Sequence, residues 1–276
     1  MRSSLEIYDL ASEGSRVVLQ TDTLIEAPNW HPDGWLLVNG AGRLYRVDLN
    51  GPRLDPIPMV LDARSNNDHG FTRDGKGILF SAHRGLGAEI FHMPTRGGAA
   101  ALISPAAPSW FHGTSPDGQA MTYPAVRGDS KTLDIHTKPF NGPERRLTQG
   151  QGQADGPEFS ADGTQIYYNC DRSGHAQIWI MQADGSDQRQ LFTDDQVNWF
   201  PHPSPDGAHV LYLAYPPGTL EHPRDLPVAL CLMNPDGNNR RALLHIIGGQ
   251  GSINGPCWSP DGKAFAYIRY HTEPRI

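Results

Sequence analysis

Three histidines, His69, His112 and His202, stand shortly before a repeated Asp-Gly pair, and acidic residues stand close to them. Imidazole nitrogens and carboxylates are ligands that transition metals accept, so a metal centre is one chemistry that this set could perform. Such a centre requires the imidazoles to converge, and His202 stands one residue later than the other two relative to its Asp-Gly pair. We therefore expect hydrogen-bonded histidines without a bound metal or other cofactor. The acidic neighbours are Asp68, Asp155 and Glu158.

Two tryptophans, Trp110 and Trp199, lie in the same segments, five to eight residues before an Asp-Gly pair. Aromatic rings supply contact area, while carboxylates, imidazoles and amides fix direction, a mixture that suits a peptide segment or a small polar ligand. The alternative is that these rings only pack between neighbouring repeats. We predict a binding mouth at these segments and assign no catalytic residue to it.

Three arginines, Arg84, Arg127 and Arg172, lie in short Gly-containing segments after apolar runs. The guanidinium group is a planar fork of donors that suits carboxylates, so a ring of arginines could bind an acidic segment. The alternative is an ion pair within one repeat, for example Asp171 with Arg172. The sequence leaves both interpretations open.

A Pro-rich stretch, residues 215–227, lengthens the fifth interval between Asp-Gly pairs to 55 residues, against 44 for the interval before it. Four prolines stiffen this stretch, and long loops on rigid scaffolds tend to carry function. The alternative is a tolerated surface insertion, since extending a loop changes the closure entropy little. We predict that the loop overhangs the binding mouth, with Tyr215, His222 and Arg224 as contact residues.

The elements that must position these residues follow from a repeat. Six Asp-Gly pairs recur every 41 to 55 residues, a period typical of propeller blades, and an apolar run follows each pair. Asp-Gly between two such runs indicates a β-hairpin, because Gly accepts the positive φ of a tight turn. The aspartates are Asp33, Asp74, Asp117, Asp162, Asp206 and Asp261.

A second series of hairpin signals alternates with the first, and its sixth copy lies at the front of the chain, ending at Gly14. The strands within residues 5–20 should therefore complete the blade that begins near Asp261, which protects its edge. The 30 Gly and 24 Pro also favour short strands and turns over helices. We predict an all-β fold with one domain over residues 1–276: a six-bladed β-propeller with four antiparallel strands per blade.

Charge and hydropathy exclude several classes of partner. With 23 basic and 30 acidic residues the formal net charge is −7, and no segment concentrates Lys and Arg, so nucleic acid is not expected. No apolar run is long enough for a membrane span or a signal peptide, so we expect no membrane insertion and a soluble, cytoplasmic monomer. A periplasmic location would require an export signal upstream of this sequence. The three cysteines imply no disulfide framework.

Residues 167–174, 177–185 and 189–191 resemble the repeat of the TolB propeller family, which runs S-P-D-G, an apolar strand, D-R-x-G, an apolar strand, D-G and R-x-L. Similar WD40-like repeats occur in the propellers of prolyl oligopeptidase-type peptidases and in oligogalacturonate lyases. The resemblance implies a bacterial binding scaffold, with a protein partner near the propeller funnel. Unlike TolB, this protein is expected to have neither an export signal nor a preceding α/β domain.

Two functions remain. The first is a non-enzymatic scaffold that binds a protein segment or a small polar ligand at the funnel face of the propeller. The second is a metal-assisted lyase or hydrolase that acts on an acidic saccharide in the central channel. The sequence contains no G-x-S-x-G nucleophile motif. We therefore favour the first function.

Overall fold

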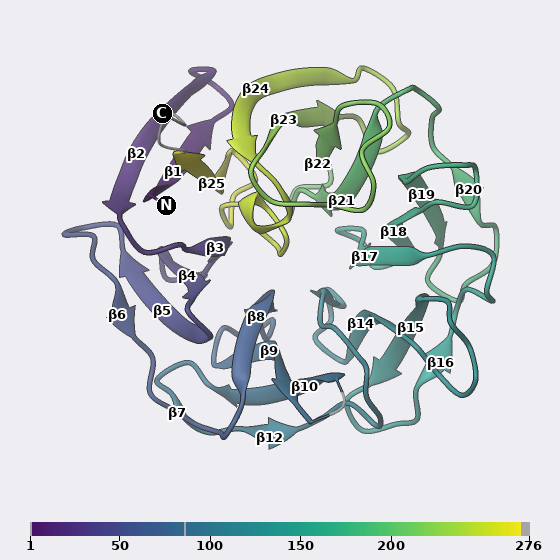
Figure 1. Cartoon of the computed structure of the whole chain (residues 1–276), viewed down its shortest axis with the longest axis horizontal. Coiled ribbons are helices and arrows are strands. Elements are labelled where there is room, and N and C mark those ends of the chain that lie inside the picture. Colours follow the sequence, from purple (N-terminus) through teal and green to yellow (C-terminus); the bar gives the residue numbers. More distant parts are fainter. Residues whose placement is uncertain (1, 86, 272–276) are drawn as a thin grey trace.

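The chain forms a six-bladed β-propeller, as the repeats predict (Figure 1). The computed structural model describes residues 2–85 and 87–271. Their sheets surround a central axis, and apart from one 3-10 turn, η1 (Gln250–Ser252), the described regular elements are strands. No helix within the described ranges is long and apolar enough to cross a membrane.

The strands are given from the axis outward. Blade 1 holds β3 (Glu26–Trp30), β4 (Trp35–Gly40), β5 (Arg43–Asp48) and β6 (Asp55–Pro56); blade 2 holds β8 (Arg64–Phe71), β9 (Gly77–Arg84), β10 (Gly87–Pro94) and β12 (Ala101–Leu102). Blade 3 holds β13 (Gly113–Thr114), β14 (Ala120–Ala125), β15 (Asp134–Pro139) and β16 (Arg145–Arg146); blade 4 holds β17 (Ala154–Phe159), β18 (Gln165–Cys170), β19 (Gln177–Gln182) and β20 (Arg189–Gln190). Blade 5 holds β21 (Val197–Pro203), β22 (Val210–Tyr215), β23 (Leu226–Met233) and β24 (Arg241–Gly248); blade 6 holds β25 (Ala264–His271), β1 (Arg2–Asp9) and β2 (Gly14–Thr21). A short parallel pair, β7 (Met59–Val60) with β11 (Gly98–Ala99), lies at the outer edge between blades 1 and 2.

Blade 6 is closed by the N-terminus, which confirms the predicted arrangement. Strand β1 pairs with β25 antiparallel along its full length, from Arg2 opposite His271 to Asp9 opposite Ala264. The innermost segment of this blade is attached to β25 by the bridge between Trp258 and Phe265. The first and last described strands thus share one sheet, which leaves no open edge between the ends of the array.

The core lies in the seams between blades. In the seam of blades 4 and 5, Tyr167 and Ile180 pack with Val210 and Tyr212, and β22 is buried along its whole length. Both faces of the central strands are covered by neighbouring blades. Their sequences are therefore continuous apolar runs, whereas a half-exposed strand would alternate apolar and polar residues. Each large side chain buried in this way stabilises the fold by about 1.5–3 kcal/mol.

The Asp-Gly pairs form hairpin turns, and those of Asp74, Asp117, Asp162, Asp206 and Asp261 share one hydrogen-bond pattern. In blade 5 the Ser204 hydroxyl donates to Asp206 Oδ1 over 2.5 Å, and the same oxygen accepts from the backbone N–H of Ala208. Gly207, which follows Asp206, has φ +71°, a backbone conformation that would be strained in a residue with a side chain. These turns define one face of the propeller, here called the Asp-Gly face. The opposite face, which carries the β22–β23 loop, is the funnel face.

Candidate functional site

Bulges in the inner strands direct polar side chains toward the axis. Strand β17 shifts its register with β18 between Asp155 and Glu158, and Gly156 within the bulge has φ +60°. A Cβ on Gly156 would lie 2.7 Å from Asn169 Oδ1, so the position requires glycine. Bulges re-aim neighbouring side chains and recur beside functional sites. Comparable register shifts occur after Glu26 in β3 and after Trp199 in β21.

Four side chains from different blades meet at the funnel mouth, and we call them the axial group: Asp68, His112, Asp155 and His222. His112 Nε2 lies 3.3 Å from Asp155 Oδ1 and 3.8 Å from Asp68 Oδ1. His222 Nε2 lies 3.9 Å from the other oxygen of Asp155. Asp68, His112 and Asp155 are buried, whereas the His222 side chain is 27% exposed. The group therefore joins blades 2, 3, 4 and 5 around the axis.

Burial and neighbouring charges oppose each other within the axial group. Burial alone would disfavour the charged imidazolium of His112, but the carboxylates of Asp155 and Asp68 outweigh it and raise the pKa of His112. Burial likewise opposes ionisation of Asp155, yet the hydrogen bond from His112 and the charges nearby lower the pKa of Asp155. For Asp68 burial prevails, and its pKa is raised. His112 and Asp155 therefore each favour the charged form of the other.

Amides from the neighbouring blades complete the mouth. Asn254 Nδ2 donates to Asp68 Oδ1 over 2.6 Å and to the backbone oxygen of Asn67 over 3.0 Å. Glu26 accepts from Asn39, and burial raises the pKa of Glu26. The sequence analysis named neither Glu26 nor Asn254 as a contact residue. Both stand seven residues before the aspartate of an Asp-Gly pair, within the spacing that predicts the mouth, as Asp155 and Trp199 do.

The β22–β23 loop reaches the axial group from blade 5 and lies in front of β22 and β23 (Figure 1). The His222 ring lies edge-on to Trp199 with 4.5 Å between centroids, and 5.4 Å from the Phe200 ring. Tyr215 is wholly buried, and its hydroxyl donates to the backbone oxygen of Pro223 over 3.0 Å. Tyr215 therefore holds the loop in place and offers no exposed surface to a ligand.

Arg224, the third loop residue predicted to make contact, is partly exposed. Its Nε lies 3.1 Å from Asp225 Oδ2, and its positive charge lowers the pKa of Glu26 against the larger opposing effect of burial. Trp110, by contrast, is half-buried before β13, and Trp199 is 8% exposed. Of the predicted aromatic and loop residues, His222 and Arg224 thus present polar groups toward the mouth.

Two of the three histidines lie apart from the axial group. His69 is buried, with Nδ1 2.5 Å from Asn29 Oδ1 and Nε2 3.0 Å from Asn39 Oδ1, and burial lowers its pKa to about 3. His202 Nδ1 lies 2.6 Å from Glu158 Oε1. The three imidazoles therefore have separate partners. Across residues 2–85 and 87–271, no three His, Cys, Asp or Glu side chains are arranged to hold a metal ion.

Glu158 lies toward the other end of the channel. It lines a hollow of about 420 Å³ at the Asp-Gly face, formed by the turns of several blades. The placement follows from the course of β17, which runs toward its Asp-Gly turn and carries Glu158 three residues nearer to that turn than Asp155. The apolar and proline side chains that line this hollow include Trp30, Pro32, Phe71, Pro116, Pro205, Trp258 and Pro260.

The three arginines form no ring at the funnel mouth, and each is held at its own blade. Arg84 Nε lies 3.0 Å from Glu89, and Arg127 donates to both oxygens of Glu144. Arg172 stacks on Trp179 with 3.6 Å from Cζ to the ring centroid. The expected alternative of an ion pair within one repeat thus describes Arg84 and Arg127. Arg172 forms none with Asp171 among the described residues.

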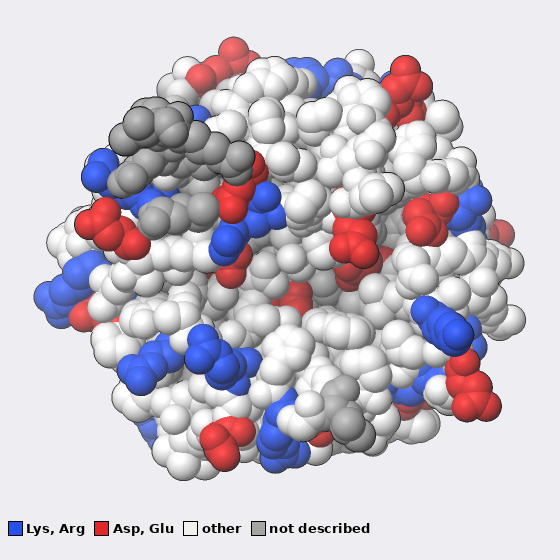
Figure 2. All heavy atoms as spheres, in the orientation of Figure 1, with Lys and Arg blue, Asp and Glu red and all other residues white. Residues whose placement is uncertain are grey.

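Charge on the funnel face is unevenly distributed. Figure 2 looks onto this face and shows a central hollow with acidic side chains in it and beside it, while basic side chains stand mostly farther out. The carboxylates of Asp68, Asp155 and Glu26 lie at this mouth among aromatic and amide side chains. Such a hollow can receive a positively charged or hydrogen-bonding group, oriented by the carboxylates and amides.

Known proteins share this architecture. Residues 105–221 match the family model described as the TolB beta propeller domain. An uncharacterized protein of Agrobacterium fabrum is 44% identical over 277 residues, which cover 98% of this chain and 93% of the relative. A solved structure from Agrobacterium tumefaciens, provisionally described as TolB, is 43% identical, with 99% of each chain covered and a TM-score of 0.95. TolB from Acinetobacter baumannii is 24% identical, with a TM-score of 0.68 over 90% of this chain and 64% of that chain, a likeness that shows the fold alone.

Proposed function

Because the chain belongs to the TolB-like β-propeller family, we propose that it is a non-enzymatic binding protein that holds a protein segment or a small polar ligand at its funnel face. The observation that carries this proposal is the axial group. Four side chains from four blades converge on an open mouth, and Asp155 lies within 4 Å of both His112 and His222. This is the arrangement of a site that orients a polar group.

The charge of the mouth refines the ligand. Burial leaves the Asp68 carboxylate poorly solvated and raises its pKa. Burial raises the pKa of Glu26 in the same way. A cationic group placed between them would favour both charged forms, since an opposite charge within about 4–6 Å stabilises a carboxylate. The ligand that suits the mouth best therefore carries an ammonium or guanidinium group, as a lysine or arginine side chain does.

The metal-assisted enzyme is less well supported. It would use the histidines as a joint ligand set, and His69 and His202 are held by Asn29, Asn39 and Glu158 instead. The cytoplasmic location and the monomeric state stay predictions from the sequence.

A peptide array tests the proposed function. The full chain is incubated with matched peptides that differ only in carrying lysine, glutamate or glutamine at one position, and bound protein is quantified. We expect lysine peptides to be retained, and binding to fall roughly tenfold in Asp155→Asn, as loss of a charged hydrogen bond would cause. Asp129→Asn, an exposed position in the β14–β15 loop, is the matched control. Equal retention of glutamate peptides, or unchanged binding by Asp155→Asn, would overturn the proposal.

A further inference from the structure

Three arginines occupy one repeat position but differ in what neutralises them. Arg84, Arg127 and Arg172 each stand ten residues after the aspartate of their Asp-Gly pair. Arg84 is paired with Glu89 and Arg127 with Glu144. Among the described residues, the Arg172 side chain donates to Gln151, Gln188 and Tyr168 and forms no ion pair with a carboxylate. Blade 4 therefore keeps at this position a positive charge that blades 2 and 3 neutralise.

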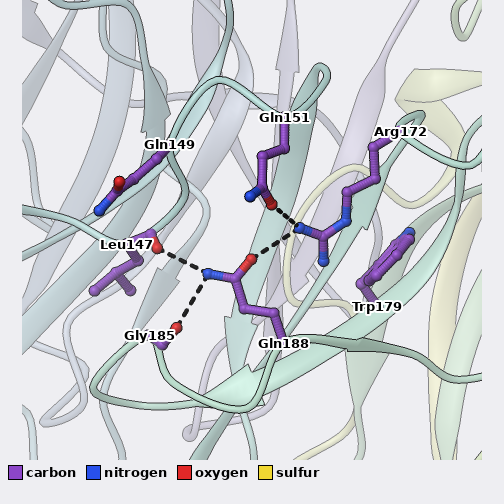
Figure 3. A pocket seen from close by; sticks show the side chains of 7 residues that line it. All are labelled: Leu147, Gln149, Gln151, Arg172, Trp179, Gly185 and Gln188. Atoms are coloured by element: carbon purple, nitrogen blue, oxygen red, sulfur yellow. Dashed lines mark hydrogen bonds between the residues drawn. The ribbon is translucent and has the colours of Figure 1, made fainter.

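The Arg172 guanidinium is held rigidly by neutral groups (Figure 3). It stacks on Trp179, and its Nη1 donates to Gln151 Oε1 over 2.6 Å and to Gln188 Oε1 over 2.9 Å. Gln188 is itself fixed, because its Nε2 donates to the backbone oxygens of Leu147 and Gly185. Stacking and two amide oxygens orient the fork without neutralising its charge.

A count of donors shows what the group still lacks. Arginine carries five N–H donors. Nη1 uses its two on Gln151 and Gln188, and Nη2 uses one on the Tyr168 hydroxyl. The inward Nε–H has no partner among the described residues, and one Nη2–H remains. An anion that displaced the exposed Gln151 oxygen could accept from Nη1 and Nη2 together, which is the bidentate geometry that carboxylates prefer.

The group faces a hollow of about 700 Å³ at the seam between blades 3 and 4, which we call the seam pocket. Three of its lining side chains are glutamine amides, which both donate and accept hydrogen bonds, and Gln149 stands across the pocket from Arg172 (Figure 3). Among the described residues, no carboxylate lines the seam pocket. The lining residues are Leu147, Gln149, Gln151, Arg172, Trp179, Gly185 and Gln188.

We propose that the seam pocket binds a small carboxylate that also carries hydroxyl groups, such as a sugar acid. The carboxylate pairs with Arg172, and the hydroxyls exchange hydrogen bonds with the amides of Gln149, Gln151 and Gln188. The site is independent of the axial group, which is acidic and suits the opposite charge. Its test therefore uses separate variants from those that test the proposed function.

The first experiment titrates the full chain with D-glucuronate and with its methyl ester, which keeps the hydroxyls but lacks the charge. The indole N–H of Trp179, which donates to the Cys170 oxygen, reports binding by its NMR shift. We expect saturable shifts with glucuronate, with a dissociation constant on the order of 1 mM, and roughly tenfold weaker binding of the ester. Equal binding of the ester, or no shift at Trp179 with glucuronate, would overturn the proposal.

The second experiment places a carboxylate in the pocket. Gln151→Glu should pair with Arg172 as Glu89 pairs with Arg84, and thereby abolish glucuronate binding while the melting temperature stays the same or rises. Arg84→Gln is the matched control, because it removes an arginine at the same repeat position, and it should leave binding unchanged. Glucuronate binding by Gln151→Glu at the affinity of the unaltered chain would also contradict the proposal.

Discussion

His112 Nε2 lies 3.3 Å from Asp155 Oδ1, so an imidazole at the start of blade 3 and a carboxylate of blade 4 form a buried pair at the propeller axis. A second carboxylate, Asp68 of blade 2, lies 3.8 Å from the same nitrogen. The pair and Asp68 together link three consecutive blades at the point where their inner strands approach. Its charge state therefore affects both the fold and the mouth.

The His112–Asp155 pair predicts a loss of stability as pH rises. The pKa of His112 is raised in the folded state above 6.5, so its protonated form contributes stability that is complete below pH 6.5 and is lost as pH rises through the folded-state pKa. Denaturant unfolding of the unaltered chain and of His112→Gln, compared from pH 6 to pH 9, measures this contribution. We expect the variant to be less stable overall and to show a flatter dependence on pH. Parallel curves for the two proteins would contradict the assignment.

His69 predicts the opposite dependence. Burial lowers its pKa to about 3, so the unfolded chain binds a proton below pH 6.5 that the folded chain does not. Stability should fall as pH drops from 6.5, by at most roughly 4 kcal/mol near pH 3. The imidazole signals of His69 should show the neutral form down to the onset of acid unfolding. An NMR titration midpoint near 6.5 for this residue would refute the prediction.

Closure of blade 6 predicts that the N-terminal strands are essential. Deleting residues 1–20 removes the partner of β25 along its full length and should abolish cooperative unfolding. A milder variant keeps the chain whole: Leu5 is fully buried, and Leu5→Ala should lower the free energy of unfolding by about 2–5 kcal/mol. Circular dichroism melts measure both effects. A truncated protein that melts at the temperature of the full chain would rule out this role.

The β22–β23 loop predicts an effect on binding without loss of the fold. Replacing residues 216–225 by a short Gly-Ser turn removes His222 and Arg224 but keeps β22 and β23, which pair in register from Val210 to Ala214. We expect a melting temperature within a few degrees of the original and altered retention of lysine peptides. His222→Gln alone, measured on the same array, separates the imidazole from the rest of the loop. Identical retention by all three proteins would show that the loop does not select ligands.

The fold could be predicted in detail because its signals are local. Each Asp-Gly turn is formed within a few residues, as Ser204, Asp206 and Gly207 show, and its spacing repeats with the blade. The displaced sixth hairpin near Gly14 indicated closure by the N-terminus, and β1 pairs with β25 as that displacement requires. Turn conformation and strand alternation depend on residues that are close in sequence, so both can be predicted from the sequence.

The site could be predicted only in part. His69 and His112 both stand five residues before the aspartate of their Asp-Gly pair, yet His69 is enclosed by two asparagines and His112 lies between two carboxylates. Tyr215 was expected to contact a ligand, and the structure turns it inward beneath Pro223. Equivalent positions thus acquire different partners, because those partners come from other blades.

The sequence by itself determined the number of blades, their four-stranded plan and the way in which the ends meet, since these follow from turns and alternation within each repeat. Only the tertiary structure decided which polar side chains converge. The bulge that aims Asp155 at His112, the loop that brings His222 to Asp155, and the absence of an acidic partner for Arg172 among the described residues all depend on side chains that lie far apart in the sequence. These arrangements arise from contacts between blades. The sequence of a single repeat does not specify the distances and charges of those contacts.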